Sequence, residues 1–115
     1  SRAAARDAIT EGYLRDRHCD PKTASCPTAT LVTDVARADA AHPIRPAYLD
    51  GVREQVDTLA RLQSSGDPAR DREAACLQLA TMIGALLLAR ATNGDPLSDE
   101  IVKATRQHLQ KRGRR

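Results

Sequence analysis

Apolar side chains recur at helical spacing along most of this chain, and proline, glycine and capping residues divide the pattern into five segments. The predicted helices cover about 3–15, 26–42, 46–63, 68–91 and 98–110. Pro27, Pro46 and Pro68 each stand in a first turn, where a proline loses no needed hydrogen bond. The pattern predicts an all-α fold, a five-helix bundle made by one domain over residues 1–115.

The boundaries of these segments follow from a few residues. His42 precedes Pro43 and is expected to end the second helix, because the residue before a proline avoids the α region. Ser98 is expected to cap the fifth helix. Residues 17–25 are rich in turn formers and are expected to connect the first two helices. The third helix carries an apolar stripe formed by Leu49, Val52, Val56 and Leu59.

The fourth segment differs from the others because residues 74–91 are apolar on nearly every side, whereas a surface helix has one apolar stripe. A membrane span needs about 20 apolar residues. The uninterrupted run from Met82 to Ala89 is much shorter, and Gln78 and Arg90 flank it, so no membrane contact is expected. We expect one face of this helix to join the core of its own domain and another to meet a partner chain.

Small residues in the same helix point to that partner. Cys76, Ala80 and Gly84 recur every four positions, and a glycine inside a helix costs about 1 kcal/mol relative to alanine unless a close contact offsets it. The last two helices of two copies would pair as a four-helix interface, giving a homodimer. The predicted interface residues are Ala80, Gly84, Leu87, Leu88, Ile101, Thr105 and Leu109.

Composition supports the helical prediction and argues against one function, the binding of single-stranded nucleic acid. Ala, Leu and Arg are abundant helix formers, while the chain has no Phe, no Trp and two Tyr, which argues against stacking platforms for single-stranded nucleic acid. The net charge is +3, with a basic C-terminal end interpreted as a solvated tail. A nucleic-acid-binding arm is the alternative. The basic residues are Lys103, Arg106, Lys111, Arg112, Arg114 and Arg115.

Catalytic and metal-binding patterns are weak. Cys19, Cys26 and Cys76 form an odd set without the close pairing typical of structural zinc sites, so neither a metal nor a cofactor is expected. Such a set also favours the reducing cytoplasm over a disulfide framework. Cys26 is expected to plug a helix entrance and Cys76 to fill a tight core position. No nucleophile–base arrangement or phosphate loop is evident, so no enzyme activity is expected.

Polar and flexible residues inside the apolar stripes suggest a cavity between helices, because ligand pockets are mostly apolar with a few orienting polar groups. Ordinary core packing of each residue is the alternative interpretation. The predicted ligand-binding residues are Tyr13, Tyr48, Val52, Gln78 and Met82.

Two ordered sets of motifs resemble the C-terminal half of one branch of TetR/AcrR-type transcriptional regulators. The first set is Tyr13-Leu14, His18, Ser25-Cys26-Pro27, Leu31 and Ala36-Arg37. The second set is the segment 83–91 followed by 97–101. The resemblance covers almost the whole chain. The chain departs from the branch at Ser25, where glycine is common, and at Cys19, where an arginine-like residue is usual.

The resemblance implies an all-helical, dimeric, ligand-sensing domain of a regulator, most simply a repressor. A small apolar effector would bind among the helices. DNA would be contacted only through a helix-turn-helix domain that this chain does not contain. A stand-alone helical protein-interaction module without a ligand is the alternative function.

Overall fold

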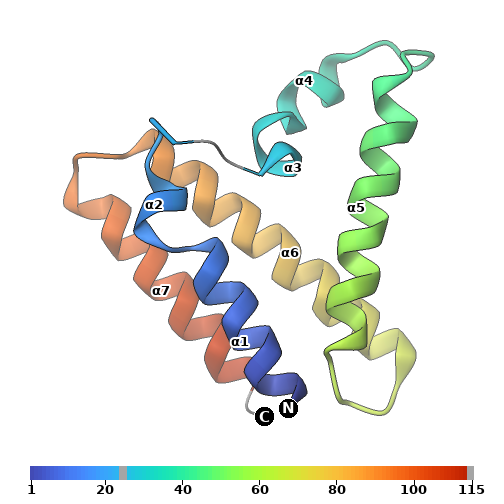
Figure 1. The fold of residues 1–115 in the computed structure, drawn as a ribbon, viewed down its shortest axis with the longest axis vertical. Helices are drawn as coiled ribbons and strands as arrows, with labels where there is room; N and C mark the ends of the chain where they lie inside the picture. The colour runs from blue at the N-terminus through green and yellow to red at the C-terminus, as the bar shows by residue number, and fades with distance from the viewer. Residues whose placement is uncertain (24–25, 114–115) are drawn as a thin grey trace.

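The computed structural model describes residues 1–23 and 26–113, and its regular structure is helical (Figure 1). The helices are α1 (Arg2–Tyr13), α2 (Asp16–Cys19), α3 (Pro27–Thr30), α4 (Val32–Arg37), α5 (Ile44–Arg61), α6 (Pro68–Ala91) and α7 (Pro96–Gly113). No strand occurs in these two ranges. The all-α prediction is therefore confirmed, and α1, α5, α6 and α7 correspond to four of the five predicted helices.

The second predicted helix is wrong in its continuity and its end. It divides at Leu31 into α3 and α4, and Ala38 is already extended, four residues before His42. A side chain explains the early end, because Arg45 donates from Nη1 to the carbonyls of Val35 at 2.9 Å and Ala38 at 3.1 Å. Because Arg45 supplies their hydrogen bonds, these carbonyls need no N–H groups from a further helical turn. The predicted turn segment also contains one short helix, α2.

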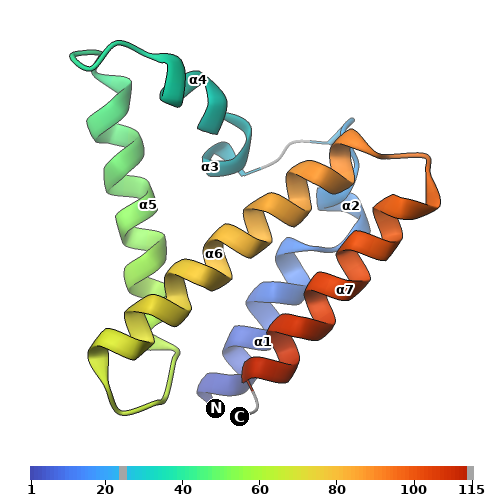
Figure 2. The same cartoon turned by 180° about the vertical axis from the view of Figure 1, so that it is seen from behind.

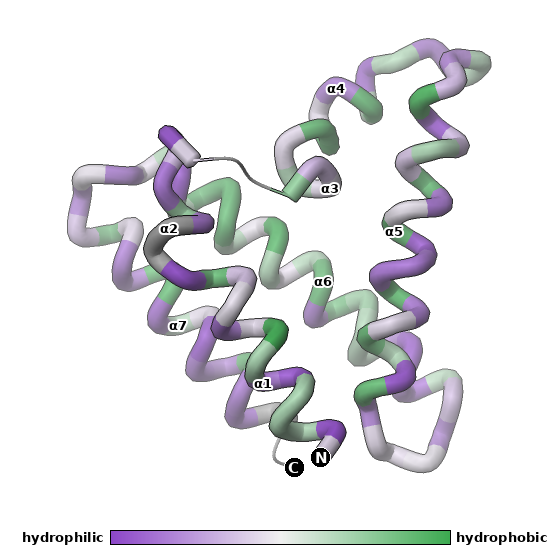
Figure 3. Tube along the Cα trace, in the orientation of Figure 1, coloured by the Kyte–Doolittle hydropathy of each residue, from purple (hydrophilic) through white to green (hydrophobic). Residues whose placement is uncertain are grey.

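Helix α6 lies at the centre of the fold. Helices α1, α2, α3, α5 and α7 all contact it. Its inner face supplies Leu79, Met82 and Leu86, which are almost completely buried. Figure 3 shows α6 as the most continuously hydrophobic helix. By length and composition α6 is apolar enough to cross a membrane, but a core helix passes the same test, and α6 forms the core here.

The molecule is flat, measuring 39 × 38 × 17 Å along its principal axes. Helices α1 and α2 cover one side of the antiparallel α6–α7 pair (Figure 1). In Figure 2, seen from behind, α6 and α7 lie side by side with no other helix in front of them. One side of this pair is therefore open.

Helix α5 starts near α3 and α4, at the open end of a V, and approaches α6 toward its own C-terminal end (Figure 1). This divergence divides the predicted stripe of α5. Val56 and Leu59 are buried in contact with α6, whereas Leu49 at the other end is 51% exposed. The splayed arrangement leaves space between α5 and α6.

The helix ends show which residues cap α6 and α7 and correct one predicted cap. Asp67 caps α6 by accepting a hydrogen bond from the Ala69 N–H at 3.0 Å. Helix α7 begins at Pro96, and Asp95 accepts from the Leu97 N–H at 2.9 Å. The predicted cap at Ser98 is wrong, because its hydroxyl donates instead to the Ala89 carbonyl. That bond joins the end of α6 to α7.

Candidate functional site

A pocket of about 420 Å³ lies between α1, α3, α5 and α6; we call it the central pocket. Its apolar wall is formed by Ile9, Tyr13, Leu59, Leu79 and Met82. Its polar wall is formed by Thr28, Glu54, Gln55 and Thr58. Gly51 completes the lining. Pockets for small molecules usually measure about 300–1,000 Å³ and combine apolar walls with a few polar groups. The size and lining of the central pocket suit a small ligand with a lipophilic body.

Gly51 creates part of this space. It lies in the interior of α5, where glycine is about 1 kcal/mol less favourable than alanine. A Cβ atom at this position would meet no atom within 4 Å, so no close helix contact demands the glycine. The missing side chain instead leaves room in the central pocket.

Hydrogen bonds hold α3 against the diverging half of α5. The Tyr48 hydroxyl donates to the Thr28 carbonyl, and the Thr28 hydroxyl donates to Gln55 Oε1 at 3.0 Å. Gln55 also points its Nε2 at Cys26 Sγ, 3.9 Å away. The polar wall is therefore positioned by side chains from both elements.

His18 connects the end of α1 to the start of α3. Its Nε2 accepts a hydrogen bond from the Cys26 N–H at 3.2 Å. Because Nε2 accepts, Nδ1 carries the proton and donates to the Tyr13 carbonyl. The rings of Tyr13 and His18 also meet edge to face, with centroids 4.7 Å apart. Three positions of the first motif set, Tyr13, His18 and Cys26, thus form one unit beside the central pocket.

Arg90 fixes the connection that carries His18. Its guanidinium donates to the carbonyls of His18 at 2.8 Å, Pro21 at 3.1 Å and Thr23 at 3.0 Å. Because Arg90 is in the last turn of α6, the connection is tied to the central helix.

The Tyr13–Cys26 pair shifts the acidity of both groups. Burial, followed by the charge of the Cys26 thiolate, raises the pKa of Tyr13 well above its ordinary value. Burial also opposes ionisation of Cys26, but hydrogen bonds from Ala29 and Thr28 outweigh it and lower the pKa of the thiol. By geometry the buried Tyr13 hydroxyl has no well-aligned hydrogen bond within the described residues. Among the charged groups that act on Tyr13, the Cys26 thiolate has the largest effect.

The predicted ligand residues divide into three groups. Tyr13 and Met82 line the central pocket. Tyr48 binds Thr28, a lining residue, and Val52 packs on the apolar cluster behind the pocket. Gln78 lies elsewhere, in a separate polar network. The structure therefore brings four of these side chains to one region, and their contact with a ligand stays a prediction.

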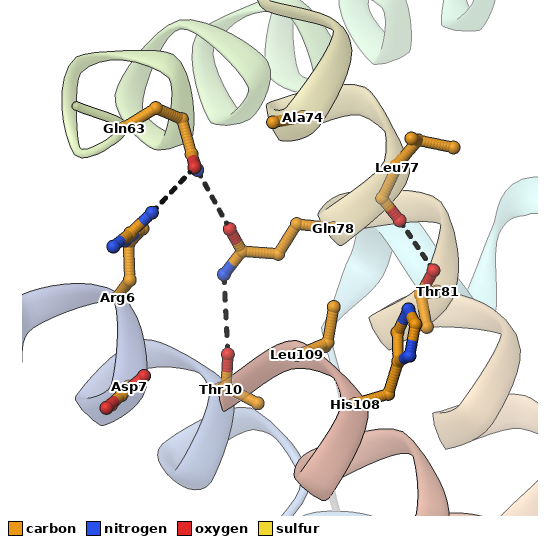
Figure 4. Close-up of a pocket in the computed structure, with 10 residues that line it drawn as sticks. All are labelled: Arg6, Asp7, Thr10, Gln63, Ala74, Leu77, Gln78, Thr81, His108 and Leu109. Carbon is orange, nitrogen blue, oxygen red and sulfur yellow. Dashed lines mark hydrogen bonds between the residues drawn. The ribbon is translucent and has the colours of Figure 1, made fainter. Parts of the chain in front are cut away.

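That network links α1, the end of α5 and α6 (Figure 4). Arg6 Nη1 donates to Gln63 Oε1 at 2.8 Å, and Gln63 Nε2 donates to Gln78 Oε1 at 3.1 Å. Gln78 Nε2 then donates to the Thr10 hydroxyl at 3.3 Å. All four side chains are buried and line a cavity of about 170 Å³. Buried polar groups require partners, and these groups supply them to one another, which gives the network a structural role.

The open side of α6 and α7 is the second candidate site; we call it the α6–α7 face. It is defined by Leu77, Ala80, Gly84 and Leu88 on α6 and by Ile101 and Thr105 on α7. Leu77 and Leu88 are 47% and 54% exposed. Residues 74–89 contain no charged side chain, so the uncharged stripe runs for about 24 Å along the helix.

The predicted interface residues differ in how far they reach this face. Ala80 and Leu88 are exposed, while Gly84 and Thr105 are half-buried. Leu87, Ile101 and Leu109 pack in part against the core of their own chain. The predicted core position of Cys76 is wrong, because Cys76 is exposed. It occupies the same small-residue ridge as Ala80 and Gly84, outside the core.

Sequence reasoning missed Gly51, Thr28 and Gln55 as pocket residues. The sequence did contain a signal for Gly51, because an isolated glycine stands there among residues that favour the helix α5. Thr28 and Gln55 gave no signal, because their role depends on the break between α3 and α4.

Several other expectations concern groups outside both sites. Among residues 1–23 and 26–113, no cluster of three His, Cys, Asp or Glu side chains could hold a metal ion. Cys19 is buried and Cys26 is half-buried, at the entrance of α3 as expected. Ser25, Arg114 and Arg115 lie outside the described residues, as do the side chains of Arg112 and of residues 16–17.

No protein-family model, curated protein or solved structure matches this chain. Its residues and their geometry therefore carry the functional interpretation.

Proposed function

We propose that this chain is the effector-binding and dimerisation domain of a TetR-like transcriptional regulator, acting as a repressor. A small, largely apolar effector occupies the central pocket, and two copies associate through the α6–α7 face. DNA is contacted by a helix-turn-helix domain that these residues do not include.

The observation that carries this proposal is the double use of α6. Leu79 and Met82 line the central pocket, while Gly84 and Leu88, within two turns, lie on the open face. A ligand that moves α6 therefore changes the geometry of the dimer directly. Such a ligand switches the regulator only if it binds one dimer geometry better than the other.

The accessible surface supports a partner on the open side. A folded monomer of 12.5 kDa is expected to expose about 6,200 Å², so the 7540 Å² of this chain is larger by about 1,300 Å². A standard interface covers about 800 Å² on each partner. The excess is therefore enough for one such interface.

Gly84 supports the same interface. A Cβ at this position would meet no atom of its own chain within 4 Å. Nothing inside the protomer offsets the cost of about 1 kcal/mol for a mid-helix glycine. The close approach of a partner helix would offset it.

A thermal-shift screen with lipophilic compounds tests the ligand-sensing part. A ligand held by the native state at 100 times its Kd raises stability by about 2.7 kcal/mol. Gly51→Leu fills the central pocket and abolishes the shift, whereas Gly51→Ala adds one methyl group and serves as the control. Hits that bind Gly51→Leu as tightly as the unaltered chain would contradict the assignment of the pocket.

Two competing functions give different results. A stand-alone interaction module without a ligand gives no hit in the same screen. A nucleic-acid arm gives DNA affinity that falls steeply with salt and disappears when residues 111–115 are deleted.

A further inference from the structure

The central pocket has one charged lining residue, Glu54, and that residue is acidic. No Lys, Arg or His lines it, although the chain contains 18 Lys and Arg residues. Two further cavities differ. The one of about 170 Å³ is lined by Arg6 and His108 as well as Asp7, and one of about 600 Å³ beside α7 is lined by Lys103 and Arg106 as well as Asp99. Only the central pocket, among these three, carries a negative charge without a compensating base.

Basic residues near the pocket are directed elsewhere. Arg53 directly precedes Glu54 on α5 but is exposed and does not line the pocket. Arg45 is engaged with two backbone carbonyls at the end of α4. Neither side chain is placed to pair with a ligand anion inside the pocket.

The apolar wall adds to the preference for positive charge. The Tyr13 ring lines the pocket, and aromatic rings attract cations to their faces. This ring favours positive charge over negative charge in a bound molecule.

We propose that the central pocket selects a lipophilic cation, an ammonium group on an aromatic or aliphatic body, over an anion of the same shape. The inference rests on the proposed ligand-sensing function. The apolar wall holds the body, and Glu54, which is exposed at the open side of the pocket, attracts the ammonium group. A carboxylate that entered the pocket would lose hydrating water, and no cation lines the pocket to replace it. The transfer of such an anion from water is strongly unfavourable.

Three probes with one aromatic body test the selection: naphthylmethylamine as the cation, naphthylmethanol as the neutral form and naphthoate as the anion. The chain has no Trp, so naphthalene fluorescence reports binding without interference from tryptophan emission. We expect the amine to bind about tenfold more tightly than naphthoate, or more, with the alcohol in between. This ratio should decrease with added salt, because Glu54 is exposed.

Two matched variants test whether the preference for the amine over naphthoate depends on the Glu54 carboxylate. Glu54→Gln should reduce the amine-to-naphthoate ratio severalfold, while Glu73→Gln, an exposed position on α6 outside the pocket, should leave it unchanged. Naphthoate binding as tightly as the amine would overturn the cation preference and leave the ligand-sensing function intact. Failure of all three probes to bind at millimolar concentration would overturn both.

Discussion

At the scale of single residues, two glycines carry much of the functional information. Gly51 and Gly84 both lie inside helices. A Cβ atom built at either position would meet no neighbouring atom within 4 Å. Sequence reasoning singled out Gly84 for its cost but missed Gly51, and it could not show which glycine faces a cavity and which an open surface. That distinction depends on the divergence of α5 from α6, which no local pattern encodes.

The two tyrosines provide a residue-scale prediction. Tyr48→Phe removes the hydrogen bond to the Thr28 carbonyl and should lower the free energy of unfolding by about 1 kcal/mol. Tyr13→Phe removes a buried hydroxyl that has no well-aligned bond among the described residues, so it should be neutral or stabilising at pH 7. Urea unfolding at one protein concentration measures both. Equal destabilisation by the two changes would contradict this account of Tyr13.

The raised pKa of Tyr13 adds a pH dependence. Below the ordinary tyrosine pKa of about 10, both the folded and unfolded states are protonated and the full stability is present. As the pH rises further, the unfolded chain ionises more readily than the fold, so stability is lost. The unaltered chain should therefore lose stability more steeply than Tyr13→Phe between about pH 9 and pH 11. Parallel curves would show that Tyr13 is not responsible.

At the scale of elements, the long helices could be predicted and the short ones could not. Periodicity and capping residues located α1, α5, α6 and α7 because those signals are local. The early end of α4 depends on Arg45, whose side chain reaches back to the carbonyls of Val35 and Ala38. The cap of α7 depends on Asp95 rather than Ser98, because the Ser98 hydroxyl is engaged by the end of α6. Tertiary contacts decided both cases.

The tie between α6 and the α1–α3 connection gives an element-scale prediction. Arg90→Met removes the guanidinium bonds to the carbonyls of His18, Pro21 and Thr23, and should destabilise the fold by about 2 kcal/mol. Amide hydrogen exchange should also become faster in residues 18–23.

Arg72→Met is the matched control for Arg90→Met. It removes an arginine from the same helix, but Arg72 forms a 2.7 Å ion pair with Asp57 in which both side chains are about half exposed. Such pairs contribute less than about 1 kcal/mol. A loss of stability for Arg72→Met as large as that for Arg90→Met would refute the special role of the tie.

At the scale of the whole molecule, the flat shape explains why one apolar helix serves two purposes. Helices α1, α3 and α5 cover α6 on its inner side, and its outer side remains open with α7. The sequence predicted two apolar faces on this helix, and the structure places Leu79, Met82 and Leu86 on the inner one. The sequence assigned Leu87 and Leu109 to the partner interface, but both pack in part against the core of their own chain.

Two leucines of nearly equal exposure allow the open side to be tested. Leu88 on the α6–α7 face is 54% exposed, and Leu49 on the far end of α5 is 51% exposed. Leu88→Glu should produce monomers, because a charge in the interface is costly to bury without a partner. Leu49→Glu should leave the association unchanged. Because both positions are exposed, both variants should melt within a few degrees of the unaltered chain.

Sedimentation equilibrium of the unaltered chain at high micromolar concentration tests the dimeric sensor most directly. The expected mass is twice 12.5 kDa, changing to 12.5 kDa in Leu88→Glu but not in Leu49→Glu. A mass of 12.5 kDa for the unaltered chain at that concentration would contradict the proposed interface, and with it the coupling of the central pocket to a dimer.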